Sequence, residues 1–228
     1  MDYKTVIVFG AHADDEITMA GTIAKMSNAG VRVVVVTMTN GCEGYPRVDM
    51  KDKIVELRRL EAAECDKVLG IARRVIFDIP DMGLTNDKQT LQKCIKVIRE
   101  ERPEAVFTHG PVERHRDHLN THNISVEARW HAGEPVAAEL GESWYPPHLY
   151  YYKGMVGNEL PTVVIDVTQT AEKPAEARAT QVSQHTLFRR TKEEFLAEVE
   201  AIRKNRPKRT ERFWITERVI LKDFLPIT

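Results

Sequence analysis

The segment Val31–Thr37 constrains the fold of this chain most, because it is an almost unbroken run of β-branched residues. A strand with this composition is buried on both faces, as is typical of parallel sheets covered by helices. Thr5–Phe9 and Ala105–Thr108 are similar short apolar runs, and helical patterns separate them along the chain. The alternation predicts an α/β fold: a Rossmann-like, mostly parallel sheet with helices on both faces and a C-terminal elaboration.

The periodicity of the apolar residues predicts where each element lies. In the first half of the chain we expect strands at Thr5–Phe9, Val31–Thr37, Arg74–Ile79 and Ala105–Thr108, and helices at Glu16–Ala29, Lys51–Leu69 and Lys88–Glu101. In the less regular second half we expect helices at Leu119–Ala132, Pro135–Ser143, Ala171–Ser183 and Glu193–Lys204, and strands at His148–Tyr152, Thr162–Val167 and Trp214–Leu221. The inward face of the helix Lys51–Leu69 is expected to carry Ile54, Leu57, Leu60, Ala62, Cys65, Val68 and Leu69. No repeat or linker divides the 228 residues, so we expect a single domain, 1–228, with a core of about 1–130 and an elaboration at 131–228.

The motif His12-Ala13-Asp14-Asp15-Glu16 follows the first strand directly. Open α/β sheets bind ligands at the carboxyl ends of their strands, so one imidazole and two adjacent carboxylates stand where a ligand binds. Nitrogen and oxygen donors suit a divalent metal such as zinc, and one carboxylate can hold the metal while the other handles a proton. The alternative is that Asp14 or Asp15 caps the helix that follows.

The motif His115-Arg116-Asp117-His118 repeats this arrangement after the strand Ala105–Thr108. A hydrolytic zinc site has three protein ligands, and two His/Asp clusters that follow two strands can supply them. Spacing alone does not select the histidine, because His115, His118 and His122 share one face if the segment is helical.

Composition and motif content exclude several classes of protein. A formal net charge of −1 provides no basic field for nucleic acid or anionic lipid. The three cysteines (Cys42, Cys65 and Cys94) have no Cys-x-x-Cys spacing, so we expect free thiols and no thiolate metal site. Neither a Gly-x-Gly-x-x-Gly motif after the first strand nor a Walker-type loop is present. Without a signal peptide or a membrane-length apolar stretch, the chain is expected to be cytoplasmic.

Taken together, Ala11–Glu16, Thr108–Pro111 and His115–His118 resemble the LmbE/PIG-L family of zinc-dependent N-acetylglucosaminyl de-N-acetylases. The family's motifs are usually His-Pro-Asp-Asp-Glu and His-Pro-Asp-His. Here Ala13 and Arg116 replace the two prolines, which changes loop geometry and keeps every ligand-type position. The resemblance covers roughly the first 125 residues.

The resemblance implies a Zn²⁺ ion held by His12, Asp15 and His118. It implies that Asp14 is the general base that takes a proton from the attacking water.

In the second motif, the resemblance implies that His115 stabilises the tetrahedral oxyanion or protonates the leaving amine. It implies that Asp117 orients His115. Arg58 and Glu61 resemble the family's Arg-x-x-Glu pattern, and Arg58 is a candidate substrate contact. Their alternative is an ordinary i, i+3 helix ion pair.

The glycine-containing loop Asn40–Tyr45 follows the second strand and is expected to border the crevice. Glu43 and Tyr45 from this loop are further candidate substrate contacts, and the tyrosine ring could stack on a sugar.

Through the resemblance, we expect a hydrolase that removes an acetyl group from an N-acetylglucosamine-type substrate, and the partner is an N-acetylated amino sugar or glycoconjugate. It also implies a homo-oligomer, a trimer or hexamer. Two other functions remain open. One is a related zinc amidase that acts on a larger acyl group or an S-conjugate, and the other is a non-catalytic sugar- or nucleotide-binding module whose acidic residues are helix caps.

Overall fold

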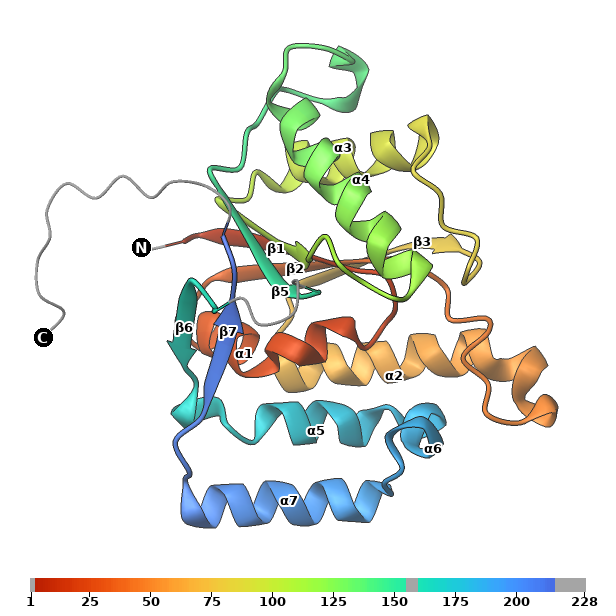
Figure 1. Cartoon of the computed structure of the whole chain (residues 1–228), viewed down its shortest axis with the longest axis vertical. Coiled ribbons are helices and arrows are strands. Elements are labelled where there is room, and N and C mark those ends of the chain that lie inside the picture. Colours follow the sequence, from red (N-terminus) through yellow and green to blue (C-terminus); the bar gives the residue numbers. More distant parts are fainter. Residues whose placement is uncertain (1–2, 155–159, 216–228) are drawn as a thin grey trace, which may run out of the picture.

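A five-stranded parallel sheet forms the centre of the molecule (Figure 1). The computed structural model describes residues 3–154 and 160–215. The strands of this sheet are β1 (Thr5–Gly10), β2 (Arg32–Thr39), β3 (Arg73–Ile79), β4 (Ala105–His109) and β5 (His148–Lys153). Their order is β3-β2-β1-β4-β5, and every neighbouring pair is parallel. A small antiparallel pair consists of β6 (Val163–Asp166) and β7 (Thr210–Phe213). The predicted fold class is confirmed.

Helices cover both faces of the sheet (Figure 1). They are α1 (Ala20–Asn28), α2 (Ile54–Leu69), α3 (Lys88–Glu101), α4 (Arg116–Gly133), α5 (Lys173–Thr180), α6 (His185–Phe188) and α7 (Lys192–Asn205). One face is covered by α3 and α4, and the other by α1 and α2; α5 packs against α2, and α7 lies outside α5. Across residues 3–154 and 160–215, no helix combines the length and the apolar character that crossing a bilayer requires.

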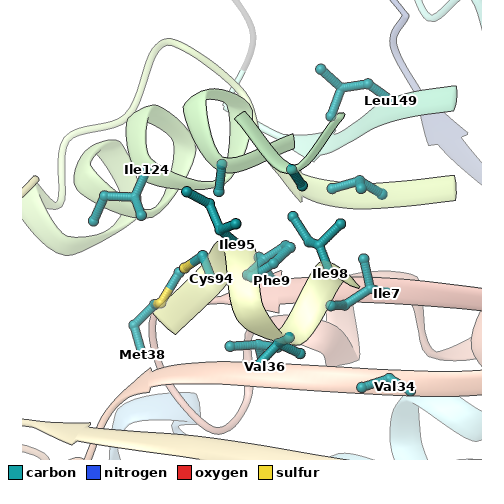
Figure 2. Close-up of a cluster of buried hydrophobic side chains, with 14 of the residues drawn as sticks. Ile7, Phe9, Val34, Val36, Met38, Cys94, Ile95, Ile98, Ile124 and Leu149 are labelled. Carbon is teal, nitrogen blue, oxygen red and sulfur yellow. The ribbon is translucent and has the colours of Figure 1, made fainter. Parts of the chain in front are cut away.

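The central strands bury both of their faces, as their composition predicts. Successive side chains of a strand point to opposite sides of the sheet. Ile7 and Val36 pack toward α3 and α4 together with Ile98 (Figure 2), whereas Val8 and Val35 pack toward α1 and α2. Two apolar cores therefore enclose the sheet and hold the carboxyl ends of β1 and β4 side by side.

The helix predicted at Glu16–Ala29 starts later than its pattern indicates. A 3₁₀ segment, Asp15–Met19, follows β1, and the chain becomes α-helical only at Ala20. The Glu211 carboxylate, from β7, accepts hydrogen bonds from the backbone N–H groups of Gly21 and Thr22 at 2.9 and 2.8 Å. A helix cap supplied by a strand so far along the chain leaves no local signal in the sequence.

The prediction that Leu60 faces inward is wrong, because its side chain is 57% exposed. The buried positions beside it belong to Arg58 and Glu61. Arg58 lines the functional cavity described below and Glu61 binds Ser183, so the inward face of α2 is turned away from Leu60.

The helix predicted at Pro135–Ser143 is reduced to a single 3₁₀ turn, Ala138–Leu140. The buried guanidinium of Arg99, in α3, holds the backbone of this segment in place. It donates hydrogen bonds to six backbone carbonyl oxygens, those of His131, Ala132, Glu134, Val136, Ala137 and Gly141.

Replacing Arg99 is therefore expected to destabilise the protein. Arg99→Met leaves several buried carbonyl groups without a donor, which costs about 2–5 kcal/mol in the free energy of unfolding. Urea denaturation measures this loss, and Lys96→Met, at an exposed position of the same helix, is the control. Equal stability of the two variants would contradict the structural role of Arg99.

The last strand in the described part of the chain, β7, precedes the strand predicted at Trp214–Leu221. β7 ends at Phe213, and Trp214 forms a single antiparallel bridge with Tyr151 of β5. The remainder of the predicted strand Trp214–Leu221, from residue 216 onward, lies outside the described residues.

Candidate functional site

The two motifs singled out in the sequence meet at the carboxyl ends of β1 and β4, which are neighbours in the sheet. His12 and Asp15 follow β1, and His118 lies in the first turn of α4, after β4. These residues border a cavity of about 530 Å³. The cavity is lined by His12, Asp14, Asp15, Ile17, Thr18, Gly41, Glu43, Gly44, Arg58, Asp81, Met82, His115, His118, Lys153, Arg178, Gln184, Leu187 and Phe188.

The structure brings together the three residues that the resemblance assigns as metal ligands. His12 Nδ1 lies 3.3 Å from His118 Nε2, and Asp15 Oδ1 lies 3.3 Å from the same His118 nitrogen. His12 Nδ1 and Asp15 Oδ2 are 3.8 Å apart. Tetrahedral zinc with bonds of about 2.0–2.1 Å separates its ligand atoms by roughly 3.3–3.4 Å, so this donor set fits such an ion.

Two overlapping triads can be drawn from this cluster: His12, His115 and His118, or Asp15, His109 and His118. In each, three ligand atoms lie within 4.8 Å of one another. His118 belongs to both, which places it at the centre of the candidate metal site.

The electrostatics of the cluster also suit a cation. Burial alone would raise the pKa of Asp15, but the imidazoles of His109, His118 and His12 hold it well below its ordinary value. Burial lowers the pKa of His118, and the neighbouring histidines contribute in the same direction. Asp15 and His118 therefore present a carboxylate and a neutral imidazole, which are the protonation states that metal binding requires. In contrast, the pKa of His12 is raised: burial lowers it, but the hydrogen bond with Asp117 and the charge of Asp15 outweigh burial.

A second carboxylate stands behind each of the two metal-facing imidazoles. Asp117 Oδ2 lies 3.4 Å from His12 Nε2, and Glu113 Oε2 lies 3.4 Å from His118 Nδ1. Carboxylates in this position orient a ligating histidine and raise its basicity. Although burial works against it, the charges and hydrogen bonding of His109, Lys153 and His118 lower the pKa of Glu113 to about 2.

The position of Asp117 differs from what the resemblance implies. Its Oδ2 is 3.9 Å from His115 Nδ1 and therefore nearer to His12 than to His115. Oδ2 also accepts a hydrogen bond from the Met82 backbone N–H at 2.7 Å, which fixes the carboxylate. His115 is the N-cap of α4, and its Nδ1 accepts a hydrogen bond from the Asp117 backbone N–H.

His109 and Glu113 are two site residues that the sequence did not assign. His109 is fully buried at the end of β4, and its Nε2 lies 3.1 Å from Asp15 Oδ2. Its place directly after an apolar strand is the signal that could have identified it. Glu113 has no comparable signal, because a loop clamped to the end of β5 by Val112 N and Gly154 O brings it beneath His118.

Asp14, predicted as the general base, also lines the cavity and lies outside both triads. Its Oδ1 is 3.3 Å from Arg58 Nη2. The buried Arg58 guanidinium also donates to Gln181 Oε1 at 3.1 Å. Arg58 therefore holds Asp14 in place.

Glu61 is the ion-pair partner suggested for Arg58, but its main contacts are with Ser183. Its carboxylate accepts hydrogen bonds from the Ser183 backbone N–H and hydroxyl at 2.6 and 2.7 Å. The distance from Glu61 Oε2 to Arg58 Nη1 is 4.0 Å.

Of the other candidate substrate contacts, Glu43 lines the cavity and Tyr45 does not. Asp81 shapes this loop, because its two carboxylate oxygens accept hydrogen bonds from the backbone N–H groups of Gly41 and Glu43. The Tyr45 ring faces the Lys51 ammonium at 5.9 Å.

Comparison with known proteins agrees with this site. A sequence model of the PIG-L family, described as GlcNAc-PI de-N-acetylase, matches residues 7–129, which are more than half of the chain and contain both motifs. Diacetylchitobiose deacetylase of Thermococcus kodakarensis is 29% identical over 194 residues, which are 80% of this chain and 71% of that protein. This chain spans only 53–62% of the length of six further curated relatives.

Solved structures share the whole architecture. N,N′-diacetylchitobiose deacetylase of Pyrococcus horikoshii aligns with a TM-score of 0.77 at 25% identity, over 94% of this chain and 84% of that one. A 4-carboxy-2-hydroxymuconate hydratase from Pseudomonas putida KT2440 aligns with a TM-score of 0.79 at 23% identity, over 97% of this chain and 100% of that one. The hydratase shows that this fold carries more than one chemistry. The family model matches the region that contains both motifs, and this match decides which family the chain belongs to. The chain belongs to the PIG-L family of de-N-acetylases, which are hydrolases of amide bonds.

Proposed function

We propose that this protein removes the acetyl group from an N-acetylated amino sugar or its glycoconjugate, with a Zn²⁺ ion held by His12, Asp15 and His118. One observation carries the proposal: donor atoms of three side chains, His12, Asp15 and His118, lie 3.3–3.8 Å from one another, with Asp15 using a different carboxylate oxygen toward each histidine. They share a cavity with Asp14, a carboxylate that is not part of the donor set. A metal-assisted hydrolase needs three closely spaced protein ligands for the ion and a separate group that acts as the base. The deacetylases that resemble this chain support the nature of the substrate.

When bound, the ion supplies Lewis acidity, which polarises the amide carbonyl and acidifies water. Asp14 takes the proton from the attacking water, and its contact with Arg58 keeps the carboxylate directed into the cavity. His115 reaches the same cavity from the opposite motif, with its ring 4.7 Å from that of His12. Since the backbone N–H of Asp117 donates to His115 Nδ1, the neutral ring carries its proton on Nε2 and can hydrogen-bond the developing oxyanion through it. To protonate the leaving amine instead, the ring would have to be the imidazolium and give up this backbone hydrogen bond.

Asp117 is proposed to position His12. Asp117→Asn keeps the acceptor for the Met82 N–H and removes the charge behind the His12 imidazole, so we expect metal affinity to fall by about 10–100-fold. Competition with a chromophoric chelator measures the change. Asp52→Asn, at an exposed position outside the cavity, is the control. Equal metal affinity in the two variants would show that Asp117 does not act through His12.

A screen of N-acetylated amino sugars and their glycosides tests the proposed function. Free amine and acetate are measured with and without added Zn²⁺, and after treatment with chelator. We expect equimolar amine and acetate, lost on chelation and restored by zinc. Release of a bulkier acid would indicate the related amidase instead. Metal-free protein of full stability that binds sugar without hydrolysis would indicate a binding module.

A further inference from the structure

Arg178 lines the cavity with a cationic group, and the proposed chemistry does not use this group. Three residues with permanently cationic side chains line this cavity: Arg58, Lys153 and Arg178. Arg58 is committed to Asp14 and Gln181. Lys153, at the end of β5, lies near Glu113, whose pKa its charge helps to lower. Arg178 comes from α5, on the C-terminal part of the chain that covers the α1–α2 layer (Figure 1).

The guanidinium of Arg178 has no counter-charge within the described part of the chain. Its one hydrogen bond runs from Nη1 to the Pro174 carbonyl of its own helix, at 3.4 Å, and no carboxylate lies within 4 Å of it among residues 3–154 and 160–215. Burial lowers the pKa of Arg178 and outweighs the attraction of the nearby Glu198. A half-buried guanidinium that lines a cavity and has unused N–H donors can hydrogen-bond a ligand bound there.

The two carboxylates nearest to Arg178 are both engaged elsewhere. The Glu198 carboxylate accepts a hydrogen bond from Arg190, and the Glu211 carboxylate is taken up by the N–H groups that begin α1. Both lie with Arg178 around a neighbouring cavity of about 210 Å³. Glu198 Oε2 and both Glu211 oxygens are therefore already hydrogen-bonded, and among the described residues neither carboxylate forms an ion pair with Arg178, which also lines the larger cavity.

We propose that Arg178 is a specificity-determining residue, which binds a carboxylate or phosphate group carried by the amino-sugar substrate. The inference rests on the proposed function and deepens it. A guanidinium pairs with a planar or tetrahedral oxyanion through two parallel hydrogen bonds, which gives both affinity and direction. A cavity of about 530 Å³ has room for a sugar with one such substituent. The scissile amide lies at the His/Asp cluster, and the anionic group lies at Arg178.

Deacetylation of three related substrates tests this assignment: N-acetylglucosamine, N-acetylglucosamine 6-phosphate and N-acetylmuramic acid. The first is neutral, and the others carry a phosphate and a carboxylate. We expect at least one anionic substrate to have a kcat/KM about tenfold or more above that of the neutral sugar. Arg178→Gln is expected to reduce this preference by about 10–100-fold, mainly through KM, as loss of a charge-assisted hydrogen bond predicts. Arg178→Lys is expected to retain an intermediate preference.

Two variants serve as comparisons. Arg203→Gln removes the same charge from the exposed surface of α7 and is expected to leave the preference unchanged. Lys153→Gln removes another cation that lines the cavity. If Lys153→Gln abolishes the preference and Arg178→Gln does not, or if Arg178→Gln lowers kcat/KM equally for all three substrates, the assignment is wrong. The same conclusion follows if the wild-type protein shows no preference for an anionic substrate.

Calorimetric binding of N-acetylglucosamine 6-phosphate to the Asp14→Asn protein separates this inference from the proposed function. Binding that Arg178→Gln weakens, without hydrolysis of any amide by the wild-type protein, would support the anion contact and overturn the proposed deacetylation. Hydrolysis without any preference for anionic substrates would do the reverse.

Discussion

Asp14→Asn is expected to lower kcat by about 10²–10⁴-fold while the protein keeps its metal. The substitution is nearly isosteric, and the asparagine oxygen can still accept a hydrogen bond from Arg58 Nη2, which lies 3.3 Å from Asp14 Oδ1. Only the ability to accept a proton is lost. Because Asp14 lies outside both triads of ligand atoms, the cluster around His118 stays intact.

The measurement pairs kcat on the best substrate from the screen with the metal content of the purified protein. Asp52→Asn, which makes the same chemical change at an exposed position, is expected to retain full activity and metal. An Asp14→Asn protein that is fully active would remove Asp14 from the reaction. If it is inactive because it has lost its metal, Asp14 is a ligand and the base lies elsewhere.

His118→Ala is expected to abolish both tight metal binding and hydrolysis. His118 contributes to both triads, and its Nε2 lies 3.3 Å from His12 Nδ1 and from Asp15 Oδ1. Removing a residue that only supports a ligand typically weakens metal binding about 10–100-fold, so loss of a ligand itself should exceed this range.

Metal affinity and kcat on the same preparation check the prediction, and His131→Ala is the control. His131 lies on the same helix, contacts Glu127 and lies outside the cavity. His118→Gln and a thermal melt guard against misfolding, since the alanine variant leaves Glu113 and Asp15 facing a void. A folded His118 variant that retains stoichiometric, tightly bound metal would show that the site is built around other residues.

The meeting of the two His/Asp motifs was predictable because it depends on sheet topology. Apolar runs end at Gly10 and at His109, and parallel strands present their carboxyl ends at one edge of the sheet. β1 and β4 are neighbours, so motifs about a hundred residues apart in the sequence come within hydrogen-bonding distance. Which histidines take part was not predictable from spacing. His122 shares a helix with His118, but its Nδ1 is hydrogen-bonded to the His109 carbonyl.

Contacts made between segments distant in the sequence were not predictable. Asp117 stands behind His12 although His115 is closer in sequence, and Glu113 stands behind His118 because its loop is clamped to β5. Arg99 and Glu211 likewise act on segments that only packing brings to them. Each of these residues occupies an unremarkable position in a helix, strand or loop pattern.

Local patterns in the sequence therefore determined the class of fold, the strands and helices of its first half and the chemical types at the site, because β-branched runs, helical periods and adjacent ligand residues act over a few positions. Tertiary structure alone decided which carboxylate supports which imidazole, how α2 is rotated and which cation in the cavity has no counter-charge among the described residues. Those outcomes depend on the rotation and spacing of whole elements against one another, which packing sets and no short stretch of sequence encodes.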